Sequence, residues 1–145
     1  MNIRYMSQDD KDEVINMMEV FYSSEAVYTN GSKDIFENDF YACISDNPFI
    51  EGYIFVNKNY ITGYAMVVKS FSTEFGKPCI WIEDLYIKEE YRGQKIGTMF
   101  FDFIQNKYKD VLLRLEVEDD NIAAIGLYKK CGFEVLPYQE MMKNT

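Results

Sequence analysis

The segment between residues 79 and 118 restricts the fold of this chain more than any other part. Residues 79–88 predict a strand, and a glycine-containing turn follows at residues 92–97. Apolar residues then recur at helical spacing, at Ile96, Met99, Phe100, Phe103 and Ile104. Residues 111–118 alternate between apolar and polar, which predicts a second strand. A strand, a helix and a strand in this order predict a parallel pair joined by a right-handed crossover.

The rest of the chain predicts further elements around this crossover. A strand is expected at 2–6, helices at about 8–23 and around residues 36–44, strands at 50–57 and 60–69, and a polar connection at 70–78. A helix over about 121–131 and a strand pair ending near Met142 complete the order. We therefore expect an α+β fold with a mixed sheet, in one domain over residues 1–145.

The composition excludes several kinds of site. The chain has no histidine, which removes Ser-His and Cys-His nucleophiles and HExxH zinc enzymes. Its three cysteines are far apart and form no CxxC pair, so we expect reduced thiols and no metal site. Catalysis must then use carboxylates, tyrosine, lysine, cysteine, backbone groups or water.

The charge and the apolar pattern limit the partners and the location. The net charge of -9 disfavours nucleic acid, whose phosphates need basic surfaces. It either attracts a cationic small molecule or only maintains solubility. No apolar run approaches the ~20 residues of a membrane helix, and the first residues do not resemble a secretory signal. We expect no membrane partner and a cytoplasmic location.

Two constellations carry the candidate chemistry. The turn from Arg92 to Gly97 leads into a helix, whose free N–H groups and dipole suit an anion, with Arg92 and Lys95 adding positive charge. The alternative is an ordinary strand-to-helix turn. On the helix that begins near Asn121, Asn121, Ala124 and Tyr128 share one face, and Gly132 follows as a C-cap. The alternative is a capped amphipathic helix whose tyrosine only packs.

Taken together, these residues resemble the GCN5-related N-acetyltransferase (GNAT) superfamily, over essentially the whole chain. Arg92 and Gly97 match the family's Arg/Gln-x-x-Gly-x-Gly/Ala signature, and Lys95 stands at its central glycine, a departure that is tolerable if Lys95 keeps a helical backbone and points outward. Asn121, Ala124, Tyr128, Gly132 and Phe133 match a second motif. The resemblance implies a twisted, mostly antiparallel sheet of about six to seven strands, a splayed parallel pair and about four helices.

The resemblance also implies acetyl-CoA as cofactor, with CoA as product. Its pyrophosphate would lie on the turn, and its pantetheine arm along the strand. The implied cofactor-binding residues are Leu85, Tyr86, Ile87, Arg92, Gly93, Gln94, Lys95, Ile96, Gly97, Thr98, Asn121, Ala124 and Tyr128.

In the family an amine attacks the thioester directly. Tyr128 is then the acid for the leaving thiolate, the Leu85 N–H steadies the oxyanion, and Glu83 is our first choice of base. Strand alternation would put Glu83 on one face with Leu85, and Asp84 on the other with Ile82, so only one carboxylate would face the acceptor. Glu83 would otherwise be a structural strand-end carboxylate. The Glu-Asp pair resembles that of diamine and polyamine acetyltransferases.

The acceptor is expected to be a primary amine of a small molecule, of the diamine, polyamine or lysine-like class. Alternatives are a protein N-terminus, an aminoglycoside, or a non-catalytic acyl-CoA-binding module. Dimerisation through the last strands is also expected. The candidate substrate residues are Phe21, Tyr22, Glu25, Tyr28, Asp84 and Glu116. As alternatives, the aromatic residues belong to the core, and Glu116 is a solvated surface residue.

Overall fold

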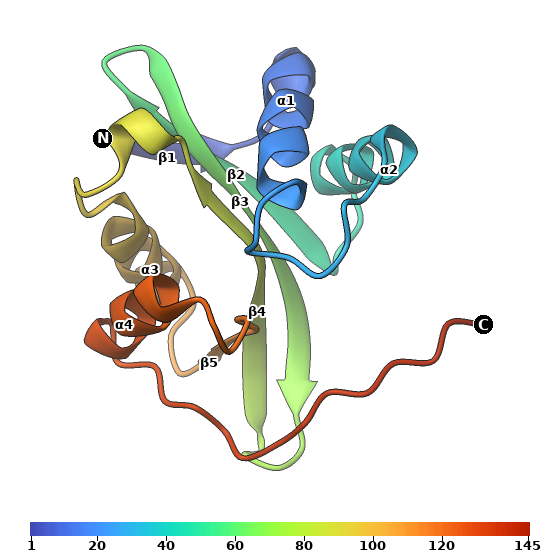
Figure 1. The fold of residues 1–145 in the computed structure, drawn as a ribbon, viewed down its shortest axis with the longest axis vertical. Helices are drawn as coiled ribbons and strands as arrows, with labels where there is room; N and C mark the ends of the chain where they lie inside the picture. The colour runs from blue at the N-terminus through green and yellow to red at the C-terminus, as the bar shows by residue number, and fades with distance from the viewer.

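The computed structural model describes residues 1–145 and has a central sheet with helices on both faces (Figure 1). Helices α1 and α2 cover one face of the sheet, and α3 and α4 cover the other. The strands are β1 Asn2–Tyr5, β2 Ile50–Asn57, β3 Tyr60–Ser72, β4 Lys77–Ile87 and β5 Leu112–Leu115. The helices are α1 Lys11–Tyr22, α2 Lys33–Ile44, α3 Ile96–Lys107 and α4 Ile122–Lys130, with short 3-10 helices η1 Gln8–Asp10 and η2 Glu89–Tyr91.

The sheet follows the order of the chain, β1-β2-β3-β4-β5. Every neighbouring pair is antiparallel except β4 and β5, which are parallel and are joined through α3. This confirms the predicted meander with one crossover. The segment expected as a polar connection at 70–78 is mostly strand, because β3 and β4 pair as far as Ser72 and Lys77.

Alternation along β3 divides the core into two clusters, one on each face of the sheet. Tyr64 and Met66 pack towards α1 and α2, whereas Ala65 and Val67 pack towards α3. Most of the apolar stripe predicted for α3 enters the second cluster, with Phe100 fully buried, but Met99 of that stripe is exposed and Phe101, outside it, is buried. The two faces therefore have separate surroundings, and a site on β4 can be approached from both.

A β-bulge interrupts this alternation on β4. Met66 of β3 pairs with Asp84, and the next residue, Val67, pairs with Ile82, so Glu83 is the extra residue. Ile82 and Leu85 both pack in the α3 cluster, whereas Asp84 lies on the α1/α2 face. The expectation that Asp84 shares a face with Ile82, and Glu83 with Leu85, is therefore wrong. The bulge shifts the alternation by one residue.

The bulge coincides with the place where β4 and β5 part. Their parallel pairing runs from Cys79–Leu112 to Ile82–Leu115 and stops there, so β5 is shorter than the predicted 111–118. Beyond Ile82, β4 continues to Ile87 with a neighbour on the β3 side alone. This is the splayed pair that the resemblance implied.

The C-terminal segment differs from the prediction. Residues 134–145 contain no strand, and the sheet has five strands rather than six to seven. Pro137 has no N–H for a ladder, and the side chains of this segment are exposed. The segment runs past the β3–β4 hairpin as extended chain (Figure 1), where the Tyr138 hydroxyl donates to Glu74 Oε2 at 2.5 Å. None of the helices combines the length and the apolar character needed to cross a bilayer.

Candidate active site

The turn after β4 exposes the amino-terminal end of α3. The first hydrogen bond of the helix runs from the Met99 N–H to the Lys95 carbonyl oxygen at 3.0 Å, so the N–H groups of residues 96–98 have no intrahelical partner. Gly93 has φ 79°, and a Cβ added there would meet nothing within 4 Å. The turn is therefore open, and free N–H groups at the positive end of the α3 dipole face that space.

Two cations flank this turn, in different conformations. Lys95 is exposed and has φ 63° and ψ 23°, so it points outward but does not keep the right-handed helical backbone. The chain enters α3 through a left-handed residue, a conformation that glycine adopts without strain. The Arg92 Nε donates to the Ile87 carbonyl oxygen at 3.0 Å, and its guanidinium lies 5.9 Å from the Tyr86 ring centre. Gln94, between them, is exposed.

The unpaired part of β4 presents backbone groups beside this turn. The Lys88 N–H donates to the β3 carbonyl of Thr62 at 2.9 Å, so every second residue before it turns its backbone groups to β3. The backbone groups of Leu85 and Ile87 therefore point to the free edge. An extended molecule with amide groups can pair there as another strand would.

Helix α4 is fixed at both ends by the residues of the second motif. The Asn121 side chain accepts a hydrogen bond from the Ala124 N–H at 3.3 Å, so Asn121 is the N-cap. Gly132 has φ 95°, and the Phe133 N–H donates to the Tyr128 carbonyl oxygen at 3.0 Å, which closes the C-terminus. The caps set the angle at which α4 leaves β5.

Tyr128 and Gly97 bring α4 against α3. The Tyr128 ring packs edge-on against Phe101 and Phe133, with ring centres 6.1 and 6.0 Å apart. A Cβ at Gly97 would lie 3.7 Å from Leu127 of α4, so this glycine faces the second helix. Burial raises the pKa of Tyr128, which keeps its hydroxyl protonated at neutral pH.

Four carboxylates gather on the α1/α2 side of β4 and β5: Asp39, Glu83, Glu116 and Glu140. Hydrogen bonding to Glu140 and burial raise the pKa of Glu116 to about 7. Burial and the charges of Asp84 and Glu140 raise the pKa of Glu83, and burial and Glu83 raise that of Asp39. None of the four forms an ion pair with lysine or arginine. Such a group favours a cationic ligand.

Two tyrosines hold the buried carboxylate of Asp84 beside this group. The Tyr64 hydroxyl donates to Asp84 Oδ2 at 2.7 Å, and the Tyr22 hydroxyl donates to Oδ1 at 2.9 Å. Burial raises the pKa of Asp84 to about 6, although the two hydrogen bonds act in the opposite direction. Sequence reasoning missed Tyr64, Asp39 and Glu140. The one available signal was a tyrosine in an otherwise apolar strand, since a buried hydroxyl needs a partner.

The remaining candidate acceptor residues are spread out. Phe21 is a core residue that packs edge-on against Tyr64 and Tyr86. Glu25 and Tyr28 lie in the loop between α1 and α2, and Tyr28 is 87% exposed. The structure thus brings Tyr22, Glu83, Asp84 and Glu116 to one side of β4 and leaves Glu25 and Tyr28 in an exposed loop.

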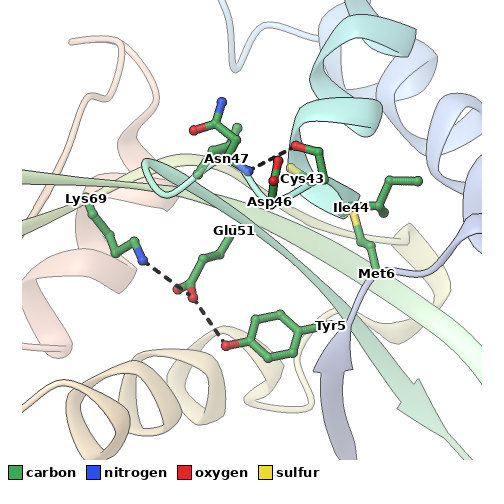
Figure 2. A pocket seen from close by; sticks show the side chains of 10 residues that line it. Tyr5, Met6, Cys43, Ile44, Asp46, Asn47, Glu51 and Lys69 are labelled. Carbon is green, nitrogen blue, oxygen red and sulfur yellow. Dashed lines mark hydrogen bonds and ion pairs between the residues drawn. The ribbon is translucent and has the colours of Figure 1, made fainter.

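A separate pocket lies at the C-terminal end of α2, against β1 and β2 (Figure 2). Two of its charged groups are paired, since Glu51 accepts from the Tyr5 hydroxyl at 3.2 Å and lies 4.0 Å from Lys69, whereas Asp46 forms no ion pair. None of the predicted site residues lines this pocket. No three of the Cys, Asp and Glu side chains, including the four carboxylates named above, are arranged so that they could hold a metal ion.

Comparison with known proteins identifies the family. Residues 14–133 match the model of the acetyltransferase (GNAT) family. A thialysine N-epsilon-acetyltransferase from Bos taurus is 39% identical over 83 residues, which are 55% of this chain and 48% of that protein. A Bacillus subtilis (strain 168) protein named "Putative ribosomal protein bS18-alanine N-acetyltransferase" is 32% identical over 101 residues, 68% of this chain and 63% of that one. The chain spans only about half the length of the thialysine enzymes it matches.

The fold agrees with that of solved structures. A possible acetyltransferase from Clostridium difficile 630 superposes with a TM-score of 0.82 at 21% identity, over 99% of this chain and 97% of that chain. Members of this family use acetyl-CoA. The described residues fit that molecule: the free edge of β4 offers backbone partners for its amides, and the open α3 N-terminus offers N–H groups for its phosphates. This chain belongs to the acetyltransferase (GNAT) family.

Proposed function

We propose that the chain transfers an acetyl group from acetyl-CoA to a primary amine of a small cationic molecule, of the diamine, polyamine or lysine-like class. The observation that carries this proposal is the bulge at Glu83. It lies where β4 parts from β5, so the free backbone edge of β4 begins there. The carboxylates without a basic partner lie beside the same point, on the α1/α2 side of the strand. A thioester on the edge and a cationic amine among the carboxylates would meet there.

The residues that would hold acetyl-CoA come from three elements. N–H groups of Ile96, Gly97 and Thr98 and the charges of Arg92 and Lys95 would bind the pyrophosphate. Backbone groups of Leu85 and Ile87 would pair with the pantetheine amides. Acetyl-CoA supplies the activated acetyl thioester when bound.

The chain's own groups would then serve the amine and the leaving sulfur. Glu83 is exposed and has a raised pKa, which suits a base that takes a proton from an ammonium group. The Leu85 N–H would steady the developing oxyanion, and the Tyr128 hydroxyl would donate a proton to the thiolate. None of these steps needs a covalent acyl-enzyme.

The charge distribution supports a cationic acceptor. Burial and neighbouring carboxylates raise the pKa values of Asp39 and Glu83, and a hydrogen bond to Glu140 and burial raise that of Glu116. None of these three has a basic partner, so a second ammonium group on the acceptor would stabilise their ionised forms. The thialysine enzyme among the relatives is named for an amine of this kind.

A thiol-release assay with acetyl-CoA and a panel of amines tests the proposal. The panel contains 1,4-diaminobutane, a triamine, thialysine, butylamine, an aminoglycoside and a peptide with N-terminal alanine. We expect turnover of the di- and triamines and of thialysine, and a higher KM for butylamine, which lacks the second polar group. Preference for the peptide or the aminoglycoside would reassign the acceptor. Acetyl-CoA binding without turnover of any amine would make the chain a binding module.

Location and assembly remain parts of the proposal. The composition favours a cytoplasmic protein. The predicted last strands are absent, but Val135, Tyr138, Met141 and Met142 of the C-terminal segment are exposed, and they are the surface we propose for a homodimer. Light scattering after size-exclusion chromatography measures the mass directly. A monomer at all concentrations up to ~100 µM, where a dimer of ~7 kcal/mol would form, would contradict it.

A further inference from the structure

Asp84 of β4 and its two hydrogen-bond partners, Tyr22 and Tyr64, form a network that the proposed mechanism does not use. Asp84 is 3% exposed and Tyr64 is 0% exposed, whereas Tyr22 is only partly buried. Both carboxylate oxygens of Asp84 are occupied, Oδ2 by Tyr64 and Oδ1 by Tyr22. Of the two hydrogen-bond partners of Asp84, only Tyr22 reaches the surface, so its hydroxyl offers a route by which a proton can enter or leave Asp84.

Because the groups around Asp84 are acidic or neutral, burying this carboxylate for a structural role alone would cost stability. The titratable groups that face it are Tyr22 of α1, Asp39 and Cys43 of α2, Tyr64 of β3 and Glu83 of β4. None is a cation, and Asp84 forms no ion pair. A buried carboxylate next to two others normally needs a basic partner. A buried carboxylate that has a perturbed environment and no basic partner is a candidate for proton transfer.

The reaction has one proton for which the proposed mechanism names no acceptor. The nitrogen begins as an ammonium with three protons and ends as a secondary amide with one. Its bond to the acetyl carbon forms as the carbon–sulfur bond breaks. Glu83 takes one proton before the attack, and the thiolate receives one from Tyr128. The second proton of the nitrogen still has to leave.

We propose that Tyr22 is a further catalytic residue, which contacts the acceptor nitrogen and relays its second proton to Asp84. The Tyr22 hydroxyl proton passes to Asp84 Oδ1 while the oxygen accepts the proton from nitrogen, so tyrosine ends unchanged and Asp84 ends neutral. Asp84 later returns the proton to solvent by the same route, Glu83 returns its own, and Tyr128 takes one back from solvent, so each turnover releases one net proton. The inference rests on the proposed function.

The position of Tyr22 suits this role. It is the last residue of α1, and its ring is fixed between Phe21 and Phe36, with ring centres 5.1 and 5.3 Å away. The hydroxyl donates to Asp84 and keeps lone pairs to accept from a nitrogen. The charge of Glu83 also acts on it, which places it on the acidic side of β4.

The structure offers a matched control. Tyr22→Phe and Tyr64→Phe each remove one hydrogen bond to Asp84, but only Tyr22 is accessible. We would measure kcat and kcat/KM from pH 5.5 to 9 with acetyl-CoA and 1,4-diaminobutane, for these variants, Asp84→Asn and the double variant Tyr22→Phe/Asp84→Asn. CoA affinity and the thermal midpoint of each variant report on folding.

Tyr22→Phe and Asp84→Asn should each lower kcat by ~30-fold or more at every pH, with CoA affinity unchanged, and the double variant should lose no more than either. Tyr64→Phe should stay within a few-fold of wild type above pH 8. Its acid limb should move to higher pH, because the carboxylate loses a stabilising hydrogen bond.

Three results would overturn the relay alone: wild-type kcat in Tyr22→Phe, equal and pH-independent losses in both tyrosine variants, or additive losses in the double variant. A wild-type protein that binds CoA and acetylates no amine would overturn the proposed function, and the relay with it. If Tyr22→Phe does not fold, the kcat of Asp84→Asn and its pH dependence test the relay instead.

Discussion

Replacing Asp84 by asparagine should change how stability depends on pH. The asparagine side chain would keep the shape of the aspartate and accept from one or both tyrosines, but it cannot ionise. In the folded protein burial raises the pKa of Asp84 from 3.8 to about 6. A folded-state pKa above the unfolded value means that the native state binds the proton more tightly. The stability that this proton gives is complete below pH 3.8 and is lost as the pH rises through about 6.

The size of the effect follows from the shift. About two pKa units correspond to ~3 kcal/mol, and roughly half of this, ~1.5 kcal/mol, falls between pH 5 and pH 8. The free energy of unfolding of the wild type should thus fall relative to Asp84→Asn by ~1.5 kcal/mol over this interval. Carboxylates remote from Asp84 titrate alike in both proteins and cancel in the difference, whereas Asp39 and Glu83 lose the charge of Asp84 in the variant and add a smaller contribution of their own.

Urea titrations at half-unit pH steps measure this difference, with circular dichroism as the signal. The exposed Asp102 on α3 provides the control, since Asp102→Asn should follow the wild-type curve at a constant offset. A constant offset for Asp84→Asn as well would show that Asp84 titrates alike in the folded and unfolded states. That result would refute the inference that Asp84 is a buried carboxylate without a basic partner.

Three further changes test other parts of the account. Tyr128→Phe should lower kcat by ~10- to 1000-fold with CoA affinity within about twofold, and an unchanged kcat would exclude it as the acid. Lys95→Gly should raise the free energy of unfolding by ~0.5–1 kcal/mol, because glycine adopts the left-handed conformation without strain, and a loss on urea titration would show that the lysine makes a compensating contact. Asn121→Ala should lower the free energy of unfolding by ~1 kcal/mol through the lost N-cap, whereas Lys130→Ala at the other end of α4 should change it by less than half of that.

The sequence predicted the elements whose signals are local. The stripe through Phe100 predicted α3, and the alternation at Leu113 and Leu115 predicted β5, because each pattern repeats within one element. Gly132 predicted the end of α4, since a left-handed C-cap favours glycine. The fold class follows from the order of such elements.

The predictions that failed concern features that depend on pairing between distant segments. Strand alternation placed Glu83 and Asp84 wrongly, because the bulge is a property of the β3–β4 register and leaves no mark in β4 alone. The partners of Asp84 are 62 and 20 residues away, at Tyr22 and Tyr64. The last strands were expected to end near Met142, and the structure leaves the side chains there exposed.

Lys95 shows another limit of prediction from the sequence. The motif located the turn, but a motif gives residue types and no dihedral angles. The φ of 63° at a lysine depends on how the chain leaves β4 and enters α3. Arg92 contributes to that path through its bond to Ile87.

The central claim is that this chain moves an acetyl group from acetyl-CoA to a primary amine of a small cation. Mass spectrometry of a reaction with acetyl-CoA and 1,4-diaminobutane, run beside Tyr128→Phe and Glu83→Gln, tests it most directly. We expect a product heavier than the diamine by one acetyl group, formed with one equivalent of free CoA and strongly reduced in both variants. Thiol release without acetylated diamine or any other acetylated amine of the panel would contradict the account.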